Sequence, residues 1–168
     1  MNKNVLLNPE NKRKFVLRIF NAIASRYDLL NHILSLGIDI LWRRKAIDLL
    51  SPVLGCRILD VATGTGDLGF EASGRKLGLR VVGVDLSKAM IREGIRKRRN
   101  KAGHIEFLCG DAECLPFSDG KFGGVTIGFG IRNVADLEVG LREIYRVLSP
   151  GGRVMVLEFS RPYFFLIR

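Results

Sequence analysis

The chain has 168 residues, of which 47% are hydrophobic, a size that predicts one domain with one core. Its 27 lysines and arginines outnumber its 17 aspartates and glutamates, and the formal net charge of +10 fits either a solvated basic surface or an acidic partner such as anionic lipid or nucleic acid. Cys56, Cys109 and Cys114 lack the paired spacing of metal ligands, and no apolar stretch approaches the ~20 residues of a membrane-spanning helix. A disulfide framework, a zinc site, a secretory signal and a transmembrane helix are not indicated, so we expect a cytoplasmic protein with reduced thiols.

Residues 1–52 have the pattern of a helical cap that precedes the first strand. From residue 11 to about residue 25, apolar side chains recur three and four residues apart, as on one face of a helix: Phe15, Ile19, Phe20 and Ile23. A second helical region ends at Ser51-Pro52. Such a cap can fold over a bound ligand and carry polar groups toward a substrate. The candidates for these contacts are Tyr27, Asp28, Asn31 and His32. The alternative is that the Tyr-Asp pair only caps a helix and that His32 is an ordinary surface or core residue.

The stretch from Arg57 to Asp67 predicts a buried strand that runs into a tight glycine turn. A short apolar run forms the strand, and Gly64 and Gly66 let the backbone turn where a Cβ would block the approach of a ligand. A helix expected from Leu68 to Lys76 would point its first N–H groups back into the turn. This arrangement is typical of a nucleotide-binding site.

The charges around this turn indicate which nucleotide it binds. With Asp85 about 20 residues further on, the turn formally matches the Gly-x-Gly-x-x-Gly fingerprint of dinucleotide-binding proteins. However, Asp60 at the strand end and Asp67 at the helix start would repel a pyrophosphate. They suit a ligand with a cationic amino end and a ribose, as in S-adenosyl-L-methionine (SAM). We therefore favour SAM, with an NAD-binding oxidoreductase and purely structural glycines as the alternatives.

Two later strands also end in acids. The run from Leu79 to Asp85 places a carboxylate where it can bind both hydroxyls of a ribose. The run from Ile105 to Cys109 is followed by Gly110, Asp111 and Ala112, where a carboxylate can accept from an exocyclic amine while a backbone N–H faces a ring nitrogen. Adenine fits this second pattern, so the three strand ends together strengthen the nucleotide hypothesis.

The helix expected after the second strand is the most basic stretch of the chain. Ser87 is predicted to cap a helix from about Lys88 to Asn100. We expect its exposed face to be solvated, or to contact acidic lipid headgroups or RNA, through Arg92, Arg96, Lys97, Arg98 and Arg99.

The rest of the chain completes an alternation of strands and helices. A fourth strand is expected from Phe122 to Gly130, a helix from about Leu137 to Leu148 that ends at Ser149-Pro150-Gly151-Gly152, and a fifth strand from Arg153 to Phe159. This order predicts an α/β fold with a doubly wound, mostly parallel sheet and right-handed crossovers. The ligand should lie over the carboxyl ends of the strands, beside the first strand.

The assembled motifs resemble those of the class I SAM-dependent methyltransferases, and more closely those of the C-methyltransferases of menaquinone and ubiquinone biosynthesis. The resemblance covers essentially residues 12–162. It is carried by Tyr27-Asp28 through Trp42, Gly64-Thr65-Gly66-Asp67, Gly110 through Phe117, Phe129 through Val134, and Arg146 through Ser160. We therefore expect a Rossmann-like class I methyltransferase fold in which residues 1–52 form the cap and residues 53–168 the SAM-binding core.

The resemblance implies transfer of the SAM methyl group to a ring carbon of a polyprenylated quinol precursor, either demethylmenaquinol or 2-methoxy-6-polyprenyl-1,4-benzoquinol. It places the cofactor on Thr65 and Asp85, with Asp111 and Ala112 at the adenine. A ring carbon becomes nucleophilic once a phenol is deprotonated, so a base and a cation are needed. The candidates are Arg132, which is otherwise a surface residue at a strand end, and in addition Tyr27 and Asn133.

The family resembled here normally continues past the fifth strand with a further helix and further strands. We therefore expect a form of the fold that lacks the last strands, which is either a shortened product or fragment, or a chain whose sheet is completed by a second copy or another chain. A SAM-binding module without turnover of its own is the alternative function. The expected surroundings are the cytoplasm, with peripheral contact at the inner face of an anionic membrane and no nucleic acid.

Overall fold

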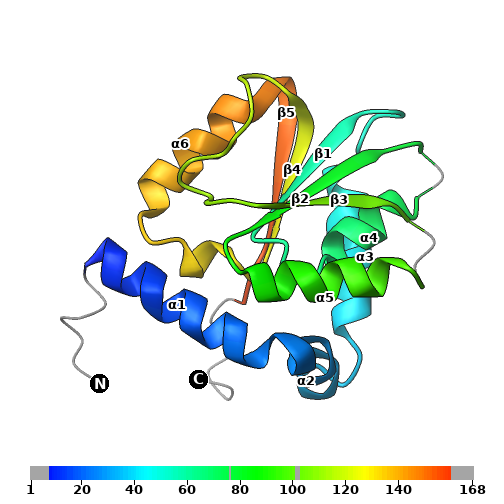
Figure 1. The fold of residues 1–168 in the computed structure, drawn as a ribbon. Helices are drawn as coiled ribbons and strands as arrows, with labels where there is room; N and C mark the ends of the chain where they lie inside the picture. The colour runs from blue at the N-terminus through cyan, green and yellow to red at the C-terminus, as the bar shows by residue number, and fades with distance from the viewer. Residues whose placement is uncertain (1–7, 76, 101–102, 160–168) are drawn as a thin grey trace, which may run out of the picture.

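The computed structural model describes residues 8–75, 77–100 and 103–159, and within them the chain folds around a parallel sheet (Figure 1). The sheet has five strands in the order β3-β2-β1-β4-β5, and every neighbouring pair is parallel. The strand bounds are Arg57–Val61 for β1, Arg80–Asp85 for β2, Ile105–Cys109 for β3, Phe122–Gly128 for β4 and Leu148–Leu157 for β5. The strand order reverses between β1 and β4, which confirms the predicted doubly wound sheet with its switch point beside the first strand.

Helices precede the sheet and connect its strands. Their bounds are Pro9–Ile23 for α1, Tyr27–Leu34 for α2, Asp39–Leu50 for α3, Asp67–Ser73 for α4, Lys88–Arg98 for α5 and Leu137–Val147 for α6, with 3₁₀ helices at Ala24–Arg26 (η2) and Ile131–Asn133 (η3). In Figure 1, α6 lies on one face of the sheet, and α3, α4 and α5 lie on the other. Ser87 caps α5 as predicted, because its hydroxyl accepts a hydrogen bond from the Met90 backbone N–H at 3.1 Å.

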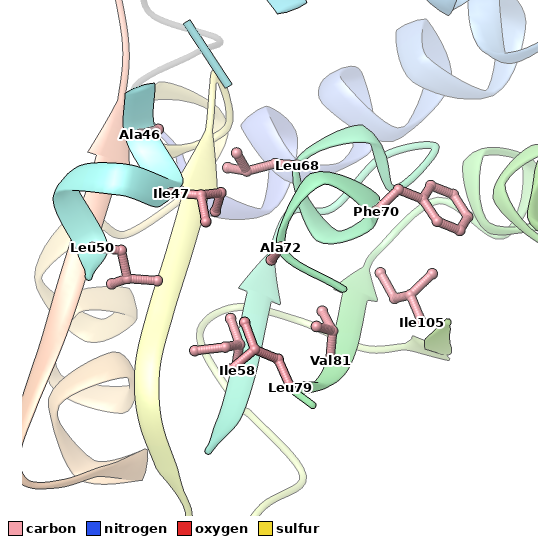
Figure 2. Close-up of a cluster of buried hydrophobic side chains, with 10 residues drawn as sticks. All are labelled: Ala46, Ile47, Leu50, Ile58, Leu68, Phe70, Ala72, Leu79, Val81 and Ile105. Carbon is pink, nitrogen blue, oxygen red and sulfur yellow. The ribbon is translucent and has the colours of Figure 1, made fainter. Parts of the chain in front are cut away.

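Alternate residues of each strand pack on opposite faces of the sheet. In β1, Ile58 belongs to the cluster against α3 and α4, whereas Leu59 belongs to the cluster against α6. Figure 2 shows the first cluster, to which α3 contributes Ala46, Ile47 and Leu50. Helix α3 is therefore part of the main core although it precedes β1, while α1 and α2 contain no fully buried residue. The division into a cap and a core at residue 52 stays a prediction.

Two details differ from the expectation. Strand β5 begins at Leu148 rather than near Arg153, so the residues predicted to end the preceding helix already run along β4. In α1, Ile19 was expected on the apolar face but is 40% exposed, whereas Phe20 of the same predicted face lines a cavity together with Val16. The inward side of α1 thus covers a cavity rather than the core.

Candidate functional site

Two adjoining cavities lie at the carboxyl ends of the strands. The larger one is bounded by residues that follow β1, β2, β3 and β4 and is covered by α1 through Arg13, Val16 and Phe20. The smaller one lies beside the glycine turn and is bounded on its outer side by α2 and α3. The residues that line both cavities are Tyr27, Ala62, Gly64, Gly128 and Phe129. The predicted position of the ligand, over the strand ends beside β1, therefore coincides with a real hollow.

The turn between β1 and α4 requires glycine at the positions that the sequence indicated. Gly64 and Gly66 have φ angles of +58° and +87°, in the left-handed region that side chains with a Cβ rarely adopt. A Cβ on Gly66 would also lie 2.6 Å from Cζ of Phe107. The backbone N–H of Gly66 donates to the Thr63 carbonyl at 2.8 Å and closes the turn. Glycine is therefore needed in this turn for packing against Phe107 beneath it, as well as for the approach of a ligand above it.

Asp60 supports this turn from inside the protein. Its side chain is completely buried and accepts hydrogen bonds from the hydroxyls of Thr63 at 2.5 Å and Thr126 at 2.7 Å, and from the Gly69 N–H at 3.2 Å. Burial raises the pKa of Asp60 to about 6, although these donors oppose the shift. The structure thus gives Asp60 a holding role for the turn, and its predicted contact with a cofactor stays a prediction.

Asp85 lies at the end of β2 and lines the larger cavity. Its two carboxylate oxygens accept hydrogen bonds from the backbone N–H groups of Gly64 at 2.7 Å and Ser87 at 2.8 Å. Burial raises the pKa of Asp85, while the two N–H groups oppose that rise. Each carboxylate oxygen has a further lone pair, so Asp85 can hold the turn and still accept from a ligand's hydroxyl groups.

Asp111 and Ala112 line the same cavity, at the end of β3, as predicted. The guanidinium of Arg13 in α1 bridges Asp111 at 2.9 Å and Glu113 at 2.7 Å. Glu113 also accepts from the backbone N–H groups of Ala135 at 2.8 Å and Asp136 at 3.0 Å. This acidic pair therefore ties α1 and the loop before α6 to the end of β3 and shapes that wall of the cavity.

Thr65 and Asp67 are engaged with charged groups of the chain itself. The Thr65 hydroxyl donates to Asp28 of α2, and Asp67 pairs with Lys97 at 2.6 Å and with Arg43 at 3.3 Å. Asp67 therefore has two cations of the chain beside it, and it shares Lys97 with Asp28 and Arg43 with Asp39. Lys97 was predicted on a solvated face, and that prediction was wrong.

Of the three predicted catalytic residues, Tyr27 and Asn133 line the larger cavity. Burial is the main cause that raises the pKa of Tyr27, so its phenol stays neutral and can donate a hydrogen bond. The Asn133 side-chain amide donates to the Phe129 carbonyl at 3.4 Å, which orients it along the cavity wall. Both residues can thus present polar groups to a substrate.

Arg132 is not among the residues that line either cavity. Its guanidinium is 3.2 Å from Glu158 and lies over the ring of Phe159 at 5.7 Å, with more than half of the side chain exposed. The structure therefore places Arg132 outside the cavities, paired with the residue that follows β5. Its predicted role requires the guanidinium to leave Glu158.

Sequence reasoning missed the cations around the cavities: Arg13, Arg43 and Lys97. They come from α1, α3 and α5, and each pairs with an acid far away in the sequence. The one local signal is in α5, where Lys97 follows buried Gly94 by three residues and buried Met90 by seven, a spacing that puts all three on one face. The spacing of residues in α5 is thus a better indicator of the inward orientation of Lys97 than the charge of the side chain.

The chain is similar to known proteins over nearly its whole length. The ubiE/COQ5 methyltransferase family matches residues 8–168. A demethylmenaquinone methyltransferase from Thermus thermophilus is 51% identical over 144 residues, which are 86% of this chain and 66% of that protein. A ubiquinone/menaquinone biosynthesis C-methyltransferase UbiE from Geotalea daltonii is 46% identical over 160 residues, which are 94% of this chain and 68% of that protein. Among solved structures, a SAM-dependent methyltransferase from Aquifex aeolicus matches 73% of this chain and 66% of its own at a TM-score of 0.65 and 18% identity, which shows the fold alone.

The sheet order, the glycine turn and the cavity at the strand ends define the class I SAM-dependent methyltransferase fold. Within that class, the chain belongs to the ubiE/COQ5 methyltransferase family. It spans about two thirds of the length of the curated relatives that it matches. The family and the fold imply SAM as the cofactor.

The residues of the larger cavity fit SAM. Asp85 keeps acceptor capacity at the strand end beside the glycine turn, where ribose hydroxyls can be held. The same cavity has an apolar lining suited to an adenine ring, formed by Val84, Leu86, Met90 and Val134. When bound, SAM supplies a methyl group on a sulfonium, which a carbon nucleophile can accept.

Proposed function

We propose that the protein is a SAM-dependent C-methyltransferase that acts on a polyprenylated quinol precursor in quinone biosynthesis. The observation that carries the proposal is one cavity in which Asp85, the Gly64 turn and the cover formed by α1 and Tyr27 come together, in a chain of the ubiE/COQ5 family. The names of the relatives support a quinone ring as the substrate. Demethylmenaquinol and 2-methoxy-6-polyprenyl-1,4-benzoquinol are the two substrates that fit this proposal.

On the cofactor side, we propose that Asp85 accepts from the ribose hydroxyls and that Asp111 and Ala112 bind the adenine edge. Gly64, Thr65 and Gly66 would form the wall at the amino acid end of the cofactor, with Asp60 fixing the turn from beneath. Asp85 is fixed by the N–H groups of Gly64 and Ser87 at 2.7 and 2.8 Å before a ligand arrives, so its orientation costs little ordering on binding.

On the substrate side, the phenol of the quinol must lose its proton and the resulting charge must be held. We propose that the neutral Tyr27 hydroxyl and the Asn133 amide orient the ring oxygen, and the support is that both residues line the cavity. We propose that Arg132 moves from Glu158 to stabilise the phenolate, while a water takes the phenol proton and passes it to solvent; the guanidinium carries no lone pair and does not accept that proton.

The test is methyl transfer from radiolabelled SAM to each of the two quinols, by the purified chain, with product identified by mass. The proposal expects label on a ring carbon of one or both quinols and no enhancement of NADH fluorescence. Labelled product at oxygen, or no label in either quinol despite cofactor binding, would contradict it. The second result would leave a SAM-binding module without turnover.

We also propose peripheral contact with an anionic membrane, in which a prenylated substrate would be dissolved. The support is the α2–α3 corner, defined as residues 29–41, whose exposed apolar side chains are Leu29, Leu30, Ile33, Leu34, Leu36, Ile38, Ile40 and Leu41. Asp39 within this corner is buried against Arg43, and exposed cations flank the corner at Arg26, Arg44 and Lys45. No helix of the described residues combines the length and the apolar character needed to cross a bilayer, so contact would be at the surface.

Vesicle flotation tests this contact. The native chain should bind anionic vesicles more tightly than neutral ones, with binding that weakens as salt rises. Replacing Leu34 and Leu36 together with serine should weaken binding at least about tenfold, since each buried leucine contributes about 1.5–3 kcal/mol. Leu49→Ser, at an exposed leucine outside the corner, is the control. Equal binding of the double variant and the native chain would refute the proposal.

A further inference from the structure

Lys97 occupies an unusual place for a lysine on a basic helix. Its side chain is only 17% exposed, whereas that of its neighbour Arg96 is 74% exposed. The Lys97 ammonium lies 2.6 Å from Asp67, 2.8 Å from Asp28 and 2.9 Å from the Thr65 hydroxyl. An ammonium has three N–H donors, so these three acceptors satisfy it completely.

The three acceptors come from different parts of the fold. Asp28 lies in the first turn of α2, whereas Thr65 and Asp67 belong to the glycine turn and the start of α4. Lys97 itself is in the last turn of α5. One side chain therefore fastens α2 to the turn that forms the floor of the cavity.

A second cation extends this network to α3. Arg43 pairs with Asp67 at 3.3 Å and with Asp39 at 2.6 Å, and Asp39 also accepts from the Ser35 hydroxyl at 2.9 Å. The network thus joins three carboxylates with two cations, Lys97 and Arg43. Without Lys97, the carboxylate of Asp28, whose side chain is 41% exposed, would lose its ion pair and lie near the carboxylate of Asp67, whose side chain is 25% exposed.

The position of α2 matters because Tyr27, the residue before Asp28, lines both cavities, and Asn31 one turn later lines the smaller one. No residue of α2 is fully buried, although Tyr27 packs edge-to-face on Phe20 with the ring centroids 5.9 Å apart. The ion pair of Asp28 with Lys97 adds a charged contact between the first turn of α2 and the end of α5.

We propose that Lys97 is a positioning residue of the site: it holds α2 against the glycine turn and so fixes Tyr27 and Asn31 over the cofactor cavity. This inference rests on the proposed function only in naming the ligand whose binding it supports. Lys97 touches neither cavity and acts through Asp28 and Thr65.

Amide hydrogen exchange measured by mass spectrometry tests the inference without any ligand. Lys97→Met and Asp28→Asn should each speed exchange in the peptide that covers residues 27–34 at least about tenfold, because each removes the fastening of α2. The Asp28 variant is the milder one, since Lys97 keeps Asp67 and Thr65 as partners. Arg96→Met, on the same helix but exposed, should leave this exchange unchanged. Native exchange across residues 27–34 in both Lys97→Met and Asp28→Asn would overturn the proposal.

Calorimetric titration with S-adenosylhomocysteine adds the functional arm. Lys97→Met should bind at least about tenfold more weakly than the native chain, and Lys97→Arg, which keeps the charge, should recover most of that loss. The double variant Asp28→Asn/Lys97→Met should lose less than the product of the two single losses, by a factor of at least about three. Independent losses, or affinity unchanged in Lys97→Met, would count against the role of Lys97. Failure of the native chain to bind S-adenosylhomocysteine would instead overturn the proposed function, and the exchange experiment would still decide the role of Lys97.

Discussion

At the scale of single residues, the acids at neighbouring strand ends differ in the role they can play, because their burial and hydrogen-bond partners differ. Asp60 borders the smaller cavity but is fully buried, and its carboxylate is engaged by three protein donors, whereas Asp85 borders the larger cavity and is held by two backbone N–H groups. The sequence places both at strand ends and cannot tell them apart, since the partners of Asp60 include Thr126, 66 residues away. Direct ligand contact is thus better assigned to Asp85, and support of the turn to Asp60.

Asp60→Asn should change the dependence of stability on pH. The folded-state pKa of Asp60, about 6, is above the usual 3.8 of an aspartate, so the native chain loses stability from this group as the pH rises from 3.8 to about 6. Asparagine is neutral throughout and does not have this loss. Relative to the native chain, the free energy of unfolding of the variant should therefore increase from pH 4 to pH 7 by up to about 3 kcal/mol. Urea unfolding at several pH values measures this change. A stability difference independent of pH in this range would contradict the assignment.

Arg132→Met should separate cofactor binding from chemistry. Because Arg132 lies outside both cavities and is paired with Glu158, its loss should leave the affinity for S-adenosylhomocysteine within about twofold of native. The proposed phenolate contact predicts a fall in kcat of at least about 100-fold. Glu158→Gln, which frees the guanidinium, is the matched control and should retain activity. A kcat within about threefold of native in Arg132→Met would remove Arg132 from the mechanism.

At the scale of elements, the cavity walls depend on contacts between distant segments. Glu113, which follows β3, forms an ion pair with Arg13 of α1 and accepts hydrogen bonds from the N–H groups of Ala135 and Asp136 before α6. Periodicity identified α1 as an amphipathic helix, but it did not reveal that a basic residue of this helix reaches acids 98 and 100 positions later. Such pairs are set by tertiary folding, so the sequence alone could not indicate them.

Glu113→Ala should destabilise the protein by about 2–4 kcal/mol, because it leaves the backbone N–H groups of Ala135 and Asp136 without their acceptor and removes one of the two carboxylates paired with Arg13. Glu138→Ala is the control, since Glu138 is 78% exposed and makes a surface pair with Arg142. This second change should cost less than about 0.5 kcal/mol. Urea unfolding of both variants measures the difference. Similar losses in the two would mean that Glu113 does not join these segments as described.

At the scale of the whole molecule, the alternation of strands and helices predicted the fold correctly. Parallel strands bring their carboxyl ends to one edge, so acids at the ends of β1, β2 and β3 could be placed together from the sequence. The orientation of side chains on helices was less predictable. Lys97 was expected to be solvated because it stands among arginines, but its side chain is mostly buried and paired with Asp28. Arg132 was expected at the site because of the family motif, but its side chain is mostly exposed and paired with Glu158.

The most direct test of the account is calorimetric titration of the purified chain with S-adenosylhomocysteine, alongside Asp85→Asn. Asp119→Asn, at an exposed carboxylate away from the cavities, is the control. We expect saturable binding to one site, weakened at least about tenfold by Asp85→Asn and unchanged by Asp119→Asn, since hydrogen bonds to a charged acceptor contribute about 1.5–3 kcal/mol. Circular dichroism would verify that each variant is folded. Absence of binding by the folded native chain, or equal affinity in Asp85→Asn, would contradict the assignment of this cavity to the cofactor.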